Sequence, residues 1–231
     1  MMMDGRMLFL LVLLPFLGSA ITGLFRGADR SGSAWFTGAI ALVAFVVTAS
    51  LYPIVSDGKV LHGTVEWLRA YGLNVTFRMD GFAWLFAMLI TGIGLLVVIY
   101  ARYYMSPEDP VPRFFSFLLS FMGSMLGVVL SGNLILLAVF WELTSIFSFL
   151  LIGYWYHNAS ARDGARMALT VTGIGGFCLL AGVLILGHIV GSYDLDKVLA
   201  AGNVVRTHPL YSVALILILL GAFTKSAQFP F

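Results

Sequence analysis

The sequence has few charged residues and only one cysteine. Of its 231 residues 10% are charged, with 13 Lys or Arg against 11 Asp or Glu, and Cys178 is the single cysteine. Ordinary globular domains carry roughly 25% charged residues, so this chain lacks the polar surface that would cover a water-soluble core. One cysteine excludes an internal disulfide and a cysteine-based metal site. The net charge of +2, with no Lys/Arg-rich run, excludes a nucleic-acid-binding surface.

Nucleotide-binding and hydrolase motifs are also missing. The sequence contains no phosphate-binding P-loop, no G-x-S-x-G and no dinucleotide-binding glycine motif followed by an acidic residue. No pair of its four histidines has the spacing of metal ligands. We therefore expect no cofactor, and the sequence identifies no metal site.

Hydrophobic residues make up 60% of the chain, and the mean hydropathy is +0.98. Apolar residues run continuously, as in Leu215-Ile-Leu-Ile-Leu-Leu220, whereas strands of a membrane barrel would alternate apolar and polar residues. A helix needs about 20 apolar residues to cross the hydrocarbon core. Seven segments meet or approach this length: 7–25, 34–54, 81–101, 114–131, 133–155, 167–190 and 209–229. The sequence predicts an all-α, polytopic integral membrane protein with about seven transmembrane helices.

The segments between the predicted spans are polar. The start of the chain imitates a signal peptide, but its apolar pattern continues to Phe25, so we interpret it as a span. We read 56–80 as a polar connection and 193–203 as a short helix at the membrane interface.

Six Lys or Arg residues are predicted on each side of the membrane, so charge does not decide the orientation. Their proximity to helix ends slightly favours an outside N-terminus.

Two groups of small residues lie within predicted spans. One contains Gly173, Gly175 and Gly176. The other follows three- and four-residue spacing along 114–131: Ser116, Ser120, Gly123, Ser124, Gly127 and Ser131. Small residues let helix backbones approach closely in lipid. Helix packing therefore explains both groups better than the walls of a pore do.

Glu142 lies near the middle of a predicted span, about 12 Å from Leu134 at 1.5 Å per residue. A charge at bilayer depth costs at least about 2.5–3.5 kcal/mol, so a carboxyl in this place points to function. One alternative is a neutral acid that only hydrogen-bonds to a neighbouring helix. A glutamine would serve that purpose without the risk of ionisation, so we interpret Glu142 as a group that gains and loses a proton.

Lys225 is a second charge deep inside an apolar segment, because fifteen mainly apolar residues precede it. Pro230 removes an amide donor and clashes with the carbonyl of Ser226, so the last helix should break between the lysine and the proline. Broken helices at membrane depth recur at the ion sites of transporters. The alternative is a lysine that extends to the interface, but the chain stays mainly apolar to Phe231.

An acid and an amine in different spans are the parts of a proton relay. Desolvation favours the neutral form of each group, whereas pairing favours the charged forms. A charge change at a third group would then make or break the pair and drive a proton onward. His188, beside Gly187 and Gly191, is a further candidate proton carrier, although such a histidine is more often an interfacial polar residue. The competing hypothesis is a membrane scaffold in which Glu142 and Lys225 only cross-link helices.

Three motifs resemble a known superfamily. Phe140-Trp-Glu142-Leu-Thr-Ser-Ile-Phe-Ser-Phe-Leu-Leu-Ile-Gly-Tyr-Trp155 is similar to the fifth-helix signature of the proton-translocating antiporter superfamily. Gly221-Ala-Phe-Thr-Lys225-Ser-Ala-Gln-Phe-Pro-Phe231 resembles its broken seventh helix, and Tyr100-Ala-Arg-Tyr-Tyr-Met105 matches further. The superfamily joins the large subunits of Mrp-type (Pha- or Mnh-type) cation/proton antiporters to the antiporter-like subunits of respiratory complex I. The resemblance implies that Glu142 and Lys225 are its essential fifth-helix glutamate and central seventh-helix lysine, both in a half-channel.

Departures from the complex I pattern favour the A-type subunit of the Mrp group. Trp141-Glu-Leu-Thr-Ser145 replaces the usual Trp-Glu-Gly-Val-Gly, and the glycines near residue 175 replace an acid-containing stretch. A partner for Lys225 would then be Glu142 or lie outside this chain. Family members are longer, so we expect an N-terminal fragment. In it, 1–110 forms a three-helix region and 111–231 an incomplete first antiporter repeat.

The sequence as a whole predicts part of a secondary active transporter and not an enzyme. We expect a multi-pass protein of a bacterial cell (inner) membrane that exchanges protons for Na⁺ or K⁺ in a hetero-oligomeric complex with other membrane subunits. It would serve pH homeostasis. The alternative is a proton-pumping subunit of an NADH:quinone oxidoreductase, which differs in its partners and not in its local chemistry.

Overall fold

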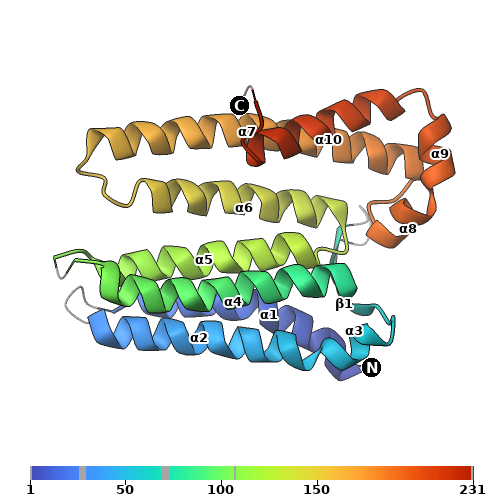
Figure 1. Ribbon diagram of the computed structural model, residues 1–231. Coiled ribbons are helices and arrows are strands. Elements are labelled where there is room, and N and C mark those ends of the chain that lie inside the picture. The colour runs from blue at the N-terminus through green and yellow to red at the C-terminus, as the bar shows by residue number, and fades with distance from the viewer. Residues whose placement is uncertain (1, 26–29, 69–72, 107, 230) are drawn as a thin grey trace. The chain divides into compact units, whose positions relative to one another are not determined.

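The computed structural model describes residues 2–25, 30–68, 73–106, 108–229 and 231 (Figure 1). Within these ranges helices dominate, and one two-stranded sheet interrupts them. The elements are α1 (Met2–Gly23), α2 (Arg30–Ser50), α3 (Tyr52–Ser56), β1 (Leu61–Leu68), β2 (Leu73–Met79), α4 (Gly81–Tyr104), α5 (Val111–Leu130), α6 (Leu134–Ile152), α7 (Ala159–Val190), α8 (Leu195–Ala200), α9 (Gly202–Thr207) and α10 (Tyr211–Lys225).

Six of these helices are long and apolar enough to cross a membrane, namely α1, α2, α4, α5, α6 and α7. The seventh apolar segment forms α10, whose 15 residues span about 22 Å, less than the hydrocarbon thickness. That helix ends at Lys225, and Ala227 just beyond it has a left-handed φ of 49°. The predicted all-α polytopic membrane fold is confirmed, and the end of α10 at Lys225 agrees with the predicted break, which itself stays a prediction. Pro230 itself lies outside the described residues.

The connection 56–80, which we expected to be a loop, contains the two-stranded sheet of β1 and β2. In β2 every second residue is apolar, and Phe77 and Met79 are buried. Such alternation is typical of a strand that is buried on one face. The predicted short helix at 193–203 is present as α8, and α9 follows it.

Residue packing divides the chain into two compact units. The first comprises Met1–Gly63 and Phe77–Leu130, and the second comprises Thr64–Thr76 and Ser131–Phe231. This division describes packing only. The predicted boundary after residue 110 concerns the repeat of the superfamily and stays a prediction.

In the first unit, α5 packs against α1 through small and polar side chains. The Ser19 hydroxyl donates to the Ser116 carbonyl at 2.7 Å, and its oxygen lies 2.6 Å from the hydroxyl of Ser120. A Cβ on Gly123 would come within 2.9 Å of the Phe16 ring. These contacts confirm the packing interpretation for this part of the small-residue group.

In the second unit, α7 packs against both α6 and α10 (Figure 1). Leu134, Leu179 and Val183 form an apolar core between these helices. Backbone hydrogen bonds tie the start of α6 to the segment after α7, because Leu134 N–H donates to the Tyr193 carbonyl and Leu195 N–H to the Gly132 carbonyl, both at 2.9 Å. These two hydrogen bonds fix where α6 begins relative to the end of α7.

Asp80 fixes the start of α4. Its carboxylate accepts the Ala83 N–H at 2.8 Å and an Arg78 guanidinium N–H at 2.6 Å. Burial alone would raise the pKa of Asp80, but these hydrogen bonds and the positive charge of Arg78 outweigh it and hold the pKa below its ordinary value. The ionised form therefore stabilises the folded protein.

Replacing Asp80 with Ala should lower the stability of the intact assembly by about 1 kcal/mol at neutral pH, because the helix start loses its cap. A lowered folded-state pKa means that the contribution is complete above about pH 4 and is lost as the pH falls further. Thermal unfolding of D80A and wild type in detergent at pH 6 and pH 3.5 measures this. A stability difference that is the same at both values would contradict the assignment.

Candidate functional site

Glu142 is held in the middle of α6 and faces α7. The Asn133 side chain fixes the start of this helix by accepting the N–H groups of Ile135 and Leu136 at 2.9 and 3.4 Å. A Cβ on Gly176 of α7 would overlap Glu142 Oε1, so the carboxyl lies directly against the Gly176 backbone. Oε1 is buried and makes no hydrogen bond with the described part of the protein. A buried polar atom without a partner is costly, which makes this carboxyl a candidate functional group.

Lys225 is the last residue of α10, and its side chain reaches α6. Its ammonium donates to Ser145 Oγ at 2.7 Å and to the Trp141 carbonyl at 3.5 Å. The same ammonium lies 5.6 Å from the centre of the Trp141 ring, within the range of a cation–π interaction. Ser145 is only 2% exposed, so this contact is inside the protein.

Glu142 and Lys225 are neighbours that do not touch. The ion pairs formed by the described residues do not include these two, although the Lys225 ammonium contacts Trp141 and Ser145, one residue before and three residues after Glu142. Ser145 comes three residues after Glu142 and therefore lies on the same side of α6, about one turn away. A rotation of the flexible lysine side chain from Ser145 towards Glu142 would bring the two charges together.

Glycines set how closely α10 approaches α7. A Cβ on Gly175 would overlap Thr224 Oγ1, and one on Gly221 would come within 2.8 Å of the Gly175 carbonyl. The Thr224 hydroxyl donates to the Gly221 carbonyl at 2.9 Å and is buried. The packing interpretation of Gly175 and Gly176 is thus supported, and Gly176 also provides the space for the Glu142 carboxyl. Gly173, in contrast, faces open space.

His188 is not part of this cluster. It is exposed in the last turn of α7, about 18 Å along the helix from Gly176 at 1.5 Å per residue. Its role as a proton carrier stays a prediction that the geometry does not strengthen. In the described residues no group of three or more His, Cys, Asp or Glu side chains could hold a metal ion.

The cluster contains a carboxyl, an amine and hydroxyls within one partly buried region. The Trp141 carbonyl accepts the Thr144 hydroxyl at 2.6 Å as well as the Lys225 ammonium, so it links both sides of the cluster. Carboxyl and amine groups can both bind and release protons, so the arrangement is suited to proton transfer. Sequence reasoning identified Glu142 and Lys225. It did not identify Ser145 as the hydrogen-bond acceptor, although its three-residue spacing from Glu142 was a usable signal.

Replacing Gly176 with Ala should reduce transport by about tenfold, because the added methyl group displaces the Glu142 carboxyl and misplacement of a reacting group is expensive. Gly173→Ala is the matched control, since it adds the same methyl to the same helix without any contact within 4 Å. Proton flux by proteoliposomes of the intact assembly measures both. Equal flux in the two variants, with equal assembly, would show that the carboxyl is not seated at Gly176.

Comparisons with known proteins match this architecture. The family profile described as NADH:quinone oxidoreductase/Mrp antiporter, TM, matches residues 131–231. The profile described as NADH-Ubiquinone oxidoreductase (complex I), chain 5 N-terminus, matches residues 67–115. The second profile covers β2 and α4, and the first covers α6, α7 and α10 with the Glu142–Lys225 cluster.

Individual relatives are similar over almost all of this chain. A probable K⁺/H⁺ antiporter protein of the A/B type from Rhizobium meliloti (strain 1021) is 66% identical over 98% of the chain, which spans 23% of that relative. The A-type subunit of the Na⁺/H⁺ antiporter of Alkalihalophilus pseudofirmus is 43% identical over 96% of the chain, which spans 27% of it. A solved Mrp complex from Dietzia sp. has a TM-score of 0.82 at 30% identity, covering 97% of this chain and 24% of that one.

The fold and the matches define a class of membrane subunits that includes both antiporters and respiratory complexes. Residues 131–231 of the chain belong to the NADH:quinone oxidoreductase/Mrp antiporter family. Within this family its similarity is to the A-type subunits of Mrp antiporters, of which it spans about a quarter. The resemblance predicted from the motifs around Glu142 and Lys225 is therefore confirmed.

Proposed function

We propose that this chain forms a proton-translocating part of a multisubunit monovalent cation/proton antiporter in the inner membrane of a bacterium. The observation that carries the proposal is the Glu142 carboxyl, whose buried Oε1 has no hydrogen-bond partner in the described chain and which lies one helical turn from the Lys225–Ser145 hydrogen bond. Such a carboxyl has few uses other than to receive and release a proton.

The cluster suggests how a proton could move. With the Lys225 ammonium on Ser145, Glu142 lacks a counter-ion and favours its protonated form, because burial disfavours a lone carboxylate. With the ammonium turned towards Glu142, the carboxylate is favoured and the proton leaves. A cation or proton arriving elsewhere in the assembly would drive the lysine between these two positions. This alternation couples a local side-chain movement to proton release.

The exchanged cation is Na⁺ or K⁺. Support comes from the relatives, since the one that is 66% identical is named for probable K⁺/H⁺ antiport and the one that is 43% identical for Na⁺/H⁺ antiport. Both names describe subunits, so we infer that other membrane subunits are partners. We also infer a secondary active transporter and not an enzyme, acting in pH homeostasis.

The second candidate is a proton-pumping subunit of a complex I-like NADH:quinone oxidoreductase. The match of residues 67–115 to the complex I chain 5 profile favours it. The proton chemistry of Glu142 and Lys225 would be the same, and the source of free energy would differ.

Reconstitution of the purified assembly decides between these candidates. Proteoliposomes holding a pH gradient receive NaCl, KCl or choline chloride, and a pH-sensitive dye reports the gradient. We expect Na⁺ or K⁺, but not choline, to dissipate it. A gradient unaffected by all three salts, together with co-purifying flavin and iron–sulfur subunits, would replace the antiporter by the complex I-like pump.

A further inference from the structure

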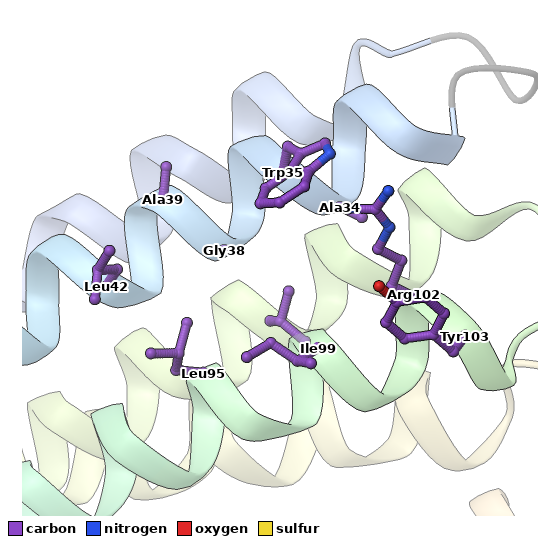
Figure 2. A pocket seen from close by; sticks show the side chains of 10 residues that line it. Ala34, Trp35, Gly38, Ala39, Leu42, Leu95, Ile99, Arg102 and Tyr103 are labelled. Carbon is purple, nitrogen blue, oxygen red and sulfur yellow. The ribbon is translucent and has the colours of Figure 1, made fainter.

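A groove runs between α2 and α4 in the first unit (Figure 2). Its volume is about 480 Å³, which lies within the roughly 300–1,000 Å³ of typical ligand pockets. Gly38 and Leu42 of α2 line one side of the groove, and Leu95 and Ile99 of α4 line the other, so its surface is apolar here. Along most of its length the groove is therefore suited to a hydrocarbon chain.

One end of the groove is positively charged. Arg102, in the last turn of α4, lies 4.5 Å from the centre of the Trp35 ring and 5.7 Å from that of Tyr103. The described ion pairs do not include Arg102, and the described lining contains no acidic residue. Arg30 lies at the same end, where its guanidinium donates to the backbone carbonyls of Arg102 and Met105. A ligand with a negative group would complement this end.

The position of the charge along the helices matches the depth of a lipid headgroup. Trp35 and Tyr103 are 67% and 78% exposed, and aromatic residues of this kind gather at membrane–water interfaces. Leu42 and Leu95 each lie seven residues from Trp35 and Arg102, which places them about 10 Å deeper in the membrane. The groove thus runs from the interface into the hydrocarbon region.

We propose that this groove binds one anionic phospholipid, with the phosphate at Arg102 and an acyl chain between α2 and α4. Basic pockets between transmembrane helices recognise anionic lipid headgroups by this combination of charge and apolar surface. An apolar helix of another subunit is a poorer occupant, because a helix about 10 Å in diameter would cover Arg102 without supplying a counter-charge. The lipid phosphate is the counter-ion of Arg102, and the acyl chain packs against the apolar side chains of the groove.

Photo-crosslinking in the intact assembly tests the proposal. A photoreactive p-benzoylphenylalanine replaces Leu95 in the groove or, as a matched control, Ile93 of the same helix, which is 56% exposed and outside the groove lining. The assembly is reconstituted in vesicles of phosphatidylethanolamine and phosphatidylglycerol, and mass spectrometry identifies the adducts. We expect phosphatidylglycerol to be enriched about fivefold at position 95 over position 93.

Arg102→Gln should remove this enrichment at position 95, whereas Arg166→Gln, which changes an exposed arginine paired with Asp163, should leave it intact. Equal headgroup ratios at positions 95 and 93 would overturn the proposal, as would adducts at position 95 to a peptide of another subunit. Enrichment that persists in R102Q would overturn the placement of the phosphate. The comparison of positions 95 and 93 decides the question even if R102Q fails to assemble.

Discussion

Replacing Glu142 with Gln is expected to reduce cation-dependent proton flux by at least about 100-fold, the scale of a lost general acid–base group. Glutamine has nearly the same size as glutamic acid, so it should occupy the same place against Gly176 of α7. It can still form hydrogen bonds, but it cannot take up or release a proton. The measurement is dye-reported flux in proteoliposomes that contain the intact assembly with E142Q.

Two further variants make this result specific. Glu142→Asp keeps the proton and shortens the side chain, so it should retain more flux than E142Q. Glu108→Gln changes an exposed acid in the turn between α4 and α5 and should have no effect. Retained ion exchange in E142Q, with normal assembly, would contradict the relay and would support the scaffold in which Glu142 only cross-links helices.

Much of the fold could be predicted because lipid imposes simple requirements. Each span must satisfy its backbone internally and stay apolar for about 20 residues, and both features are visible in a local window of sequence. The sheet was missed because residues 56–80 were judged only by their polarity. The alternation of Val75, Phe77 and Met79 with polar residues was a strand signal that this criterion ignores.

The two charged residues of the candidate site could be predicted, because a charge inside an apolar segment is easy to recognise in a sequence. Glu142 and Lys225 stand out because ionisable groups are rare at these depths. The contacts between the helices were not predictable in the same way. Lys225 and Ser145 lie 80 residues apart, and their hydrogen bond depends on how α10 packs on α7 and α7 on α6. A single sequence contains no local signal for that packing.

The glycines of α7 are a second example of contacts that the sequence pattern does not predict. The sequence pattern indicated helix packing for Gly173, Gly175 and Gly176 alike. In the structure each has a different neighbour: Gly173 faces open space, Gly175 faces Thr224, and Gly176 faces Glu142. Only the third position contacts the carboxyl to which we assign proton transfer. Spacing alone identifies a packing surface and does not show which position of it seats a functional side chain.

Replacing Lys225 with Ala is expected to reduce flux by about 100-fold, because the positive charge beside Glu142 and Ser145 is then lost. Lys59→Ala, which removes an exposed lysine paired with Asp57 at 3.3 Å, is the control and should leave flux unchanged. Proteoliposomes of the intact assembly, assayed across a range of pH values, measure both variants.

Lys225→Arg distinguishes two roles for the amine. A guanidinium keeps its positive charge at any physiological pH, whereas a buried lysine can release its proton. If Lys225 passes on a proton during transport, K225R should be nearly as impaired as K225A. If Lys225 supplies only a positive charge beside Glu142, K225R should restore most of the flux. We expect the second result, because in the proposed alternation the amine stays charged and only moves between Ser145 and Glu142. K225R as impaired as K225A would contradict this alternation. Full activity of K225R would assign proton transfer to Glu142 alone.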